Sequence, residues 1–119
     1  MNVAAWIVGA ILMAIFTLSG VSKLLDIGQM PAARGKFGYR KRDFRLIGLA
    51  ELAGVAGLVI GLVRFSLEYI AIAAALGLAI VMFGALMAHA RVEDEGKDIA
   101  PAAVVLVLTI LFIVFISLR

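Results

Sequence analysis

The pattern of apolar and charged positions divides the chain into four long apolar stretches separated by charged connectors. A helix rises about 1.5 Å per residue, so crossing the ~30 Å apolar core of a bilayer takes about 20 residues. The stretches are residues 3–22, 46–63, 69–90 and 99–118. Each is long enough to cross once, and together they contain one charged residue, Glu51. The pattern therefore predicts four transmembrane helices, over about 3–24, 45–63, 67–90 and 99–118.

The composition agrees with this pattern and excludes a water-soluble protein. Hydrophobic residues make up 65% of the chain and charged residues 16%, and the mean hydropathy is +1.15. A soluble domain carries about 25% charged and about 45–50% apolar residues. An outer-membrane barrel is also excluded, because its strands alternate apolar and polar residues over short segments. The sequence therefore predicts an all-α integral membrane protein, a four-transmembrane-helix bundle in which residues 1–119 form one domain.

The two shorter connectors contain signals for helix starts. Ser66 is expected to cap the third helix, with Glu68 in its first turn. Pro101 is expected at the start of the fourth helix, where the missing N–H of proline costs least. These residues are interpreted as ordinary helix boundaries.

The long first connector contains a weaker helical pattern. A short interfacial helix there would place Met30, Ala33 and Phe37 on one side. However, Gly35 and Gly38 lower the helix propensity of this segment. We therefore do not expect it to be helical.

Lys and Arg are distributed unevenly between the connectors. The first and third connectors contain nine of the eleven, and only Arg64 and Arg119 lie on the other side. Cytoplasmic loops retain Lys and Arg, so both termini are expected outside a plasma membrane and these two connectors inside. The asymmetry accounts for the net charge of +3 without a nucleic-acid partner. The run Arg40-Lys41-Arg42 is interpreted as a topology determinant, with a site for lipid head groups or an acidic partner as the alternative.

Small residues recur at helical spacing in two of the predicted helices. Such stripes allow helix backbones to approach closely in a membrane. They predict that the second and third helices pack through these positions, which are Ala50, Gly54, Gly57 and Gly61 in the second and Ala73, Gly77, Gly84 and Ala88 in the third.

A few polar residues from different helices are expected at a similar membrane depth. Glu51 is the one carboxylate inside a predicted span, and an ionised carboxylate there needs a partner. Lys23 ends the first helix and His89 the third, so both reach the same leaflet as Glu51. Ser19 lies one turn before Lys23, and Tyr39 belongs to the connector. The sequence predicts a polar or ligand-binding cluster of these five residues.

Each member of this cluster also has a structural interpretation. Lys23 has a stem long enough to reach the head groups, or to pair with Asp26. His89 has the alternative of facing water at the interface. Glu51 is interpreted as an interhelical bond, a ligand or proton site, or a protonated group facing lipid.

Several kinds of chemistry are excluded by residue types. The chain contains no Cys, which excludes disulfides, thiolate nucleophiles and Cys-ligated metals. A single His and one intramembrane carboxylate are not expected to form a metal site. The sequence offers no Ser-His-Asp or paired-carboxylate arrangement, so no catalytic residue is assigned.

Four groups of residues resemble the DoxX-like family of small four-helix membrane proteins, over nearly the whole chain. They are Ser19-Gly20-x-x-Lys23-Leu24, Gly38-Tyr39, Leu46-Ile47-Gly48-x-x-Glu51-Leu52-x-Gly54-x-x-Gly57-Leu58-x-x-Gly61-Leu62, and His89 at the end of the third helix. The resemblance implies a bundle in the plasma membrane, and it extends to Lys23, Glu51 and His89. Named members of the family include subunits linked to thiosulfate:quinone oxidation and membrane-associated oxidoreductase complexes.

Three classes of function follow from these observations. The favoured hypothesis is an accessory or anchoring subunit of a membrane redox system, without catalytic activity of its own. It would bind a quinone, lipid or other apolar molecule near Glu51 and His89, so quinone is the candidate cofactor. Its candidate partners are the lipid bilayer, oxidoreductase subunits and a second copy of the chain. The alternatives are an assembly or scaffold protein without a ligand, and a small proton-coupled transporter.

Overall fold

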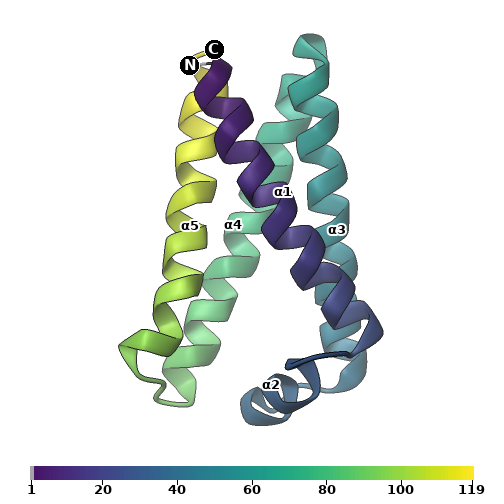
Figure 1. Cartoon of the computed structure of the whole chain (residues 1–119), viewed down its shortest axis with the longest axis vertical. Helices are drawn as coiled ribbons and strands as arrows, with labels where there is room; N and C mark the ends of the chain where they lie inside the picture. Colours follow the sequence, from purple (N-terminus) through teal and green to yellow (C-terminus); the bar gives the residue numbers. More distant parts are fainter. Residues whose placement is uncertain (1) are drawn as a thin grey trace.

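The computed structural model describes residues 2–119, and nearly all of them are helical (Figure 1). These residues contain no strand. The helical segments in chain order are α1 (Asn2–Leu25), α2 (Met30–Phe37), α3 (Lys41–Val63), the short 3-10 turn η1 (Phe65–Leu67), α4 (Glu68–Arg91) and α5 (Gly96–Ser117).

The four long helices form a closed ring. α1 packs against α3 and α5, and α4 packs against the same two helices from the other side. α2 and the α4–α5 connector lie at one end of the bundle, which we call the α2 end, while both chain ends lie at the opposite end (Figure 1). The two connectors rich in Lys and Arg therefore share one end of the molecule.

All four long helices are long and apolar enough to cross a membrane. Their outward faces carry large apolar side chains, such as Leu18, Ile80 and Phe83, which are exposed in the isolated chain. Lipid acyl chains cover such faces at no desolvation cost, whereas water does not. The prediction of an all-α integral membrane bundle of four transmembrane helices is confirmed.

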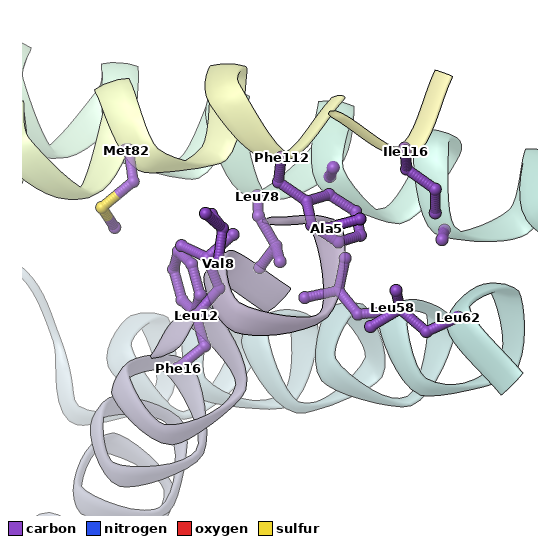
Figure 2. Packing of buried hydrophobic residues seen from close by; sticks show 12 residues of the cluster. Ala5, Val8, Leu12, Phe16, Leu58, Leu62, Leu78, Met82, Phe112 and Ile116 are labelled. Carbon is purple, nitrogen blue, oxygen red and sulfur yellow. The ribbon is translucent and has the colours of Figure 1, made fainter. Parts of the chain in front are cut away.

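The core lies along the axis of the ring and is built mainly from large apolar side chains (Figure 2). All four helices contribute to it, and α4 adds the small buried residues Ala71 and Ala75. The largest apolar members are fully buried: Leu12 and Phe16 from α1, Leu58 from α3, Leu78 from α4, and Phe112 and Ile116 from α5.

α3 meets α4 through the glycine stripe predicted on the second transmembrane helix. A Cβ atom built on Gly61 would lie 2.6 Å from the backbone nitrogen and 2.9 Å from the Cα of Ala71. Gly54 and Gly57 approach the side chains of Leu78 and Ala74. The prediction that this stripe packs against a neighbouring helix is confirmed for these three glycines, and at Gly61, where the neighbour is backbone, only a residue without a side chain fits. Ala50, the fourth member of the stripe, is exposed.

The stripe predicted on the third transmembrane helix is wrong as a packing surface. A Cβ atom on Gly77 or Gly84 would meet nothing within 4 Å, and Ala73 is exposed. Only Ala88 of this set is buried. α4 instead packs through a different face, which carries Ala71, Ala75, Leu78 and Met82, so spacing alone did not identify the packing face.

Three helix starts differ from the predicted ones. α3 begins at Lys41 rather than near 45, because the Asp43 carboxylate accepts a hydrogen bond from the backbone N–H of Arg40 at 2.9 Å. Ser66 does not cap α4: it lies within η1, and α4 follows with Glu68 in its first turn. Pro101 lies inside α5, which begins at Gly96, so its ring removes one backbone hydrogen bond there.

Arg119 ties the helix ends together on the side opposite α2. Its guanidinium donates to the carbonyl oxygens of Gly61 at 2.8 Å and Leu62 at 3.2 Å, and to Glu68 Oε2 at 3.3 Å. A longer contact of 3.5 Å reaches the side chain of Asn2. These bonds satisfy carbonyls that the end of α3 leaves without helical partners. In the sequence, Arg119 was counted only as one of the two positive charges on the side of the membrane with few Lys and Arg residues.

Candidate functional site

The site begins where α1 and α3 come closest. A Cβ atom on Gly48 would lie 2.6 Å from the carbonyl oxygen of Gly20 and 3.1 Å from the Cβ of Lys23. This close backbone approach brings Lys23 within reach of Glu51, one turn further along α3. The Lys23 ammonium forms a hydrogen-bonded ion pair with Glu51 Oε1.

Glu51 is sealed inside the bundle by this pair. Its side chain is 0% exposed and that of Lys23 is 14% exposed, which excludes the lipid-facing interpretation of Glu51. The second carboxylate oxygen, Oε2, is the one buried side-chain polar atom in residues 2–119 without a hydrogen-bond partner. A buried charge is stable only when paired, so Lys23 is essential to hold Glu51 in this position.

Lys23 does not pair with Asp26, because Asp26 is bound by another residue. The connector turns sharply after α1, with Asp26 at φ 55° and Gly28 at φ 64°. Asp26 then accepts two hydrogen bonds from the Arg34 guanidinium, at 2.9 and 3.1 Å. These bonds hold the pKa of the Asp26 carboxyl below its usual value. They also fasten α2 to the end of α1.

The helix over residues 30–37 forms in spite of its glycines, so the prediction of a non-helical connector is wrong. Pro31 lies in its first turn, where proline is favoured. Gly38 adopts φ 78° and ends the helix, which is a position that favours glycine rather than one it disrupts. The single-residue propensities did not include these two end effects.

The other side of α2 is held by the connector between α4 and α5. Lys36 Nζ lies 2.5 Å from Asp94 Oδ1, while His89 Nδ1 lies 2.5 Å from Asp94 Oδ2. Phe37 packs edge-on against the His89 ring at 5.0 Å between centroids, and Arg91 donates to the Phe37 carbonyl at 2.7 Å. α2 is therefore held on both sides, like a cover across the α2 end of the bundle.

A cavity of 520 Å³ lies beneath this cover. Its wall includes the face of α2 that carries Met30, Ala33 and Phe37, the three residues that the spacing placed on one side. On α4 the wall includes Gly84 and Val81. The open space beside Gly84 is therefore part of a cavity rather than a missing helix contact.

Four of the five residues in the predicted cluster line this cavity, namely Ser19, Lys23, Tyr39 and His89. Glu51 does not belong to the wall formed by residues 2–119, and it stands behind Lys23. The predicted cluster therefore consists of a buried ion pair between Lys23 and Glu51, and a cavity whose wall includes Lys23.

Three charged residues of this region were missed in the sequence. Lys36 and Asp98 line the cavity, and Asp94 binds both Lys36 and His89. They lie in connectors whose charges were interpreted only through membrane topology. His89 and Asp94 are five residues apart and lie on either side of the end of a helix, so helical periodicity could not predict their contact.

The family comparison agrees with this arrangement. The model of the DoxX-like family matches residues 7–112, which include α2, α3 and α4 in full and most of α1 and α5. The chain belongs to the DoxX-like family. No curated protein and no solved structure matches it. In this DoxX-like protein, Lys23, Glu51 and His89, the residues on which the resemblance rested, lie in or directly behind the wall of one cavity.

Proposed function

We propose that this DoxX-like protein binds a quinone in the cavity under α2 and serves as an accessory subunit of a membrane redox system. The observation that carries the proposal is the cavity itself. Its 520 Å³ fall within the range of about 300–1,000 Å³ that is common for sites of small molecules. It combines an apolar interior with a few polar side chains at the α2 end, which suits an apolar molecule with a polar ring.

The charges around the cavity favour a neutral ligand over an anionic one. Both lysines of the wall already have carboxylate partners, Lys23 with Glu51 and Lys36 with Asp94. Neither provides an uncompensated positive charge for a phosphate. Their remaining N–H groups and the hydroxyls of Ser19 and Tyr39 are hydrogen-bond donors. Quinone carbonyl oxygens accept such bonds without adding charge.

In this proposal Glu51 is a positioning residue. It holds the Lys23 ammonium at the cavity wall, where the amine can donate to a ligand carbonyl. The scaffold alternative uses the same ion pair only to fasten α1 to α3. The two functions differ in whether the cavity is occupied, so filling the cavity distinguishes them.

Replacing Gly84 by Leu is expected to weaken quinone binding at least about tenfold, a loss of ~1.4 kcal/mol. The new side chain would enter the cavity, since the position beside Gly84 is open. Binding of a decyl-substituted benzoquinone to protein in phosphatidylcholine nanodiscs would be measured by the quenching of protein fluorescence, and copurified quinone by mass spectrometry.

Gly77→Leu is the matched control for this experiment. Gly77 lies on the same helix and is equally open, but it does not line the cavity. This variant should bind the quinone as wild type does. Unchanged affinity in Gly84→Leu, or no binding by the wild type, would favour the scaffold function.

The proposed location is the plasma membrane, with the α2 end in the cytoplasm. Nine Lys and Arg residues belong to the two connectors at this end, and such residues resist translocation. Single Cys residues introduced at Arg40 and at Ser117 should therefore react from opposite sides of intact cells. The chain has no natural Cys to interfere. Labelling of position 40 by an impermeant external reagent would reverse the proposed orientation.

A further inference from the structure

His89 and Asp94 form a hydrogen-bonded pair at the edge of the cavity. His89 Nδ1 lies 2.5 Å from Asp94 Oδ2, and the Phe37 ring packs edge-on against the imidazole. Asp94 is itself held by Lys36, and its side chain is only 6% exposed. The imidazole ring therefore has a defined position and orientation.

The contacts of Asp94 determine which nitrogen of His89 carries the proton. Hydrogen bonds from Lys36 and from His89 lower the pKa of the Asp94 carboxyl, so it stays ionised. An ionised carboxylate accepts a hydrogen bond, which assigns a proton to Nδ1 of His89. The lone pair of a neutral imidazole is then on Nε2.

Nε2 is the polar atom of His89 that remains available to a ligand. His89 lines the cavity, and Nε2 has no hydrogen-bond partner in residues 2–119. Among these residues, Glu51 Oε2 is the only side-chain polar atom that is both buried and without a partner. Since Nε2 of His89 also lacks a partner, it is accessible rather than buried. An accessible nitrogen with a lone pair thus belongs to a ring that lines the cavity and is oriented by a carboxylate.

We infer that His89 exchanges a proton with the ligand in this cavity, through Nε2 and a weakly acidic ligand hydroxyl such as that of a phenol or hydroquinone. The inference rests on the proposed function, since it requires a ring bound under α2. In the forward step the ligand O–H bond breaks and an Nε2–H bond forms. The electron pair stays on the ligand oxygen, so the step needs no oxidant.

The surrounding charges stabilise the product of this step. Lys36 and Asp94 cancel each other, so a protonated His89 adds one positive charge beside the ligand oxyanion. Opposite charges attract more strongly in an apolar cavity than in water. The other charged residues nearby on the packed elements are Lys23 (paired with Glu51), Arg34 (paired with Asp26), Arg91 and the exposed Asp98.

A nitrophenol with an alkyl chain tests the inference directly, because its oxyanion absorbs visible light and its neutral form does not. Bound to wild type in phosphatidylcholine nanodiscs, it should ionise at a lower pH than when bound to His89→Gln. We expect a difference of about one pKa unit, which is tenfold in the ionisation equilibrium.

Two controls separate the possible results. Glu95→Gln removes an exposed carboxylate of the connector that contains Asp94, which forms an exposed pair with Lys97 at 3.5 Å, and it should behave as wild type. The methyl ether of the probe has no acidic proton, so its affinity reports binding alone. If wild type does not bind the ether, the proposed function fails and the inference with it. If the ether binds but the phenol ionises equally in wild type and His89→Gln, only the inference fails.

Discussion

Replacing Lys23 by Met is expected to destabilise the bundle by about 3–5 kcal/mol, the usual cost of removing one member of a buried ion pair. Glu51 is 0% exposed, and its Oε2 already lacks a partner. Without Lys23, both oxygens would be buried without an ionic partner. Thermal unfolding of the purified protein in detergent, followed by circular dichroism, would measure the loss.

The combined variant tests whether the two residues act as a pair. Glu51→Gln removes the charge that Lys23 neutralises, so the double variant should cost less than the sum of the two single ones. For residues in contact we expect a coupling of about 0.5–3 kcal/mol. Strictly additive losses would contradict a stabilising pair. Lys97→Met is the control, because its side chain is 77% exposed and its contact with Glu95 is weak at 3.5 Å, so the change should stay within about 0.5 kcal/mol.

The same variants also test how Glu51 contributes to ligand binding. If Glu51→Gln retains the fold but loses the quinone, Glu51 positions Lys23 for the ligand. If stability and binding are both retained, Glu51 is incidental to the site.

Replacing Gly61 by Leu is expected to destabilise the protein by about 3 kcal/mol, at the upper end of the cost of overpacking. Even the Cβ atom would lie 2.6 Å from the backbone nitrogen of Ala71, and backbone atoms cannot move aside as a flexible side chain can. α3 and α4 would have to separate along much of their contact. The melting temperature in detergent measures this effect.

Gly77→Leu again provides a matched comparison. It makes the same chemical change in a neighbouring transmembrane helix, at a position where a Cβ atom meets nothing within 4 Å. Its melting temperature should equal or exceed that of wild type, because Gly is a poor helix former. A large loss at both glycines would show that packing against α4 is not the cause.

The positions of the transmembrane helices were predictable because membrane insertion depends mainly on local composition. About 20 apolar residues span a bilayer whatever they pack against, so the four stretches could be identified one by one. The ion pair was predictable for a related reason. A carboxylate in an apolar span needs a partner, and few cations lie at a suitable depth, so Glu51 led to Lys23.

The packing faces were less predictable, because spacing does not show which side of a helix meets its neighbours. The stripes on α3 and α4 have the same type of pattern, yet Gly61 touches the backbone of Ala71 while Gly77 faces away from the bundle. Which stripe is buried depends on how each helix is rotated in the ring. That rotation follows from the core side chains of all four helices together.

The all-α class, the four membrane crossings, the grouping of positive charges and the pairing of Glu51 could all be predicted from the amino-acid sequence, because each depends on the cost of placing a given residue in lipid. That α2 covers a cavity depends on the assembled bundle. Arg34, Lys36 and Phe37 reach partners in the turn after α1, in the last connector and in α4, and these contacts exist only once the bundle has assembled. The tertiary structure also brought Asp94 to His89, because a turn in the backbone, rather than helical spacing, places the carboxylate beside the ring.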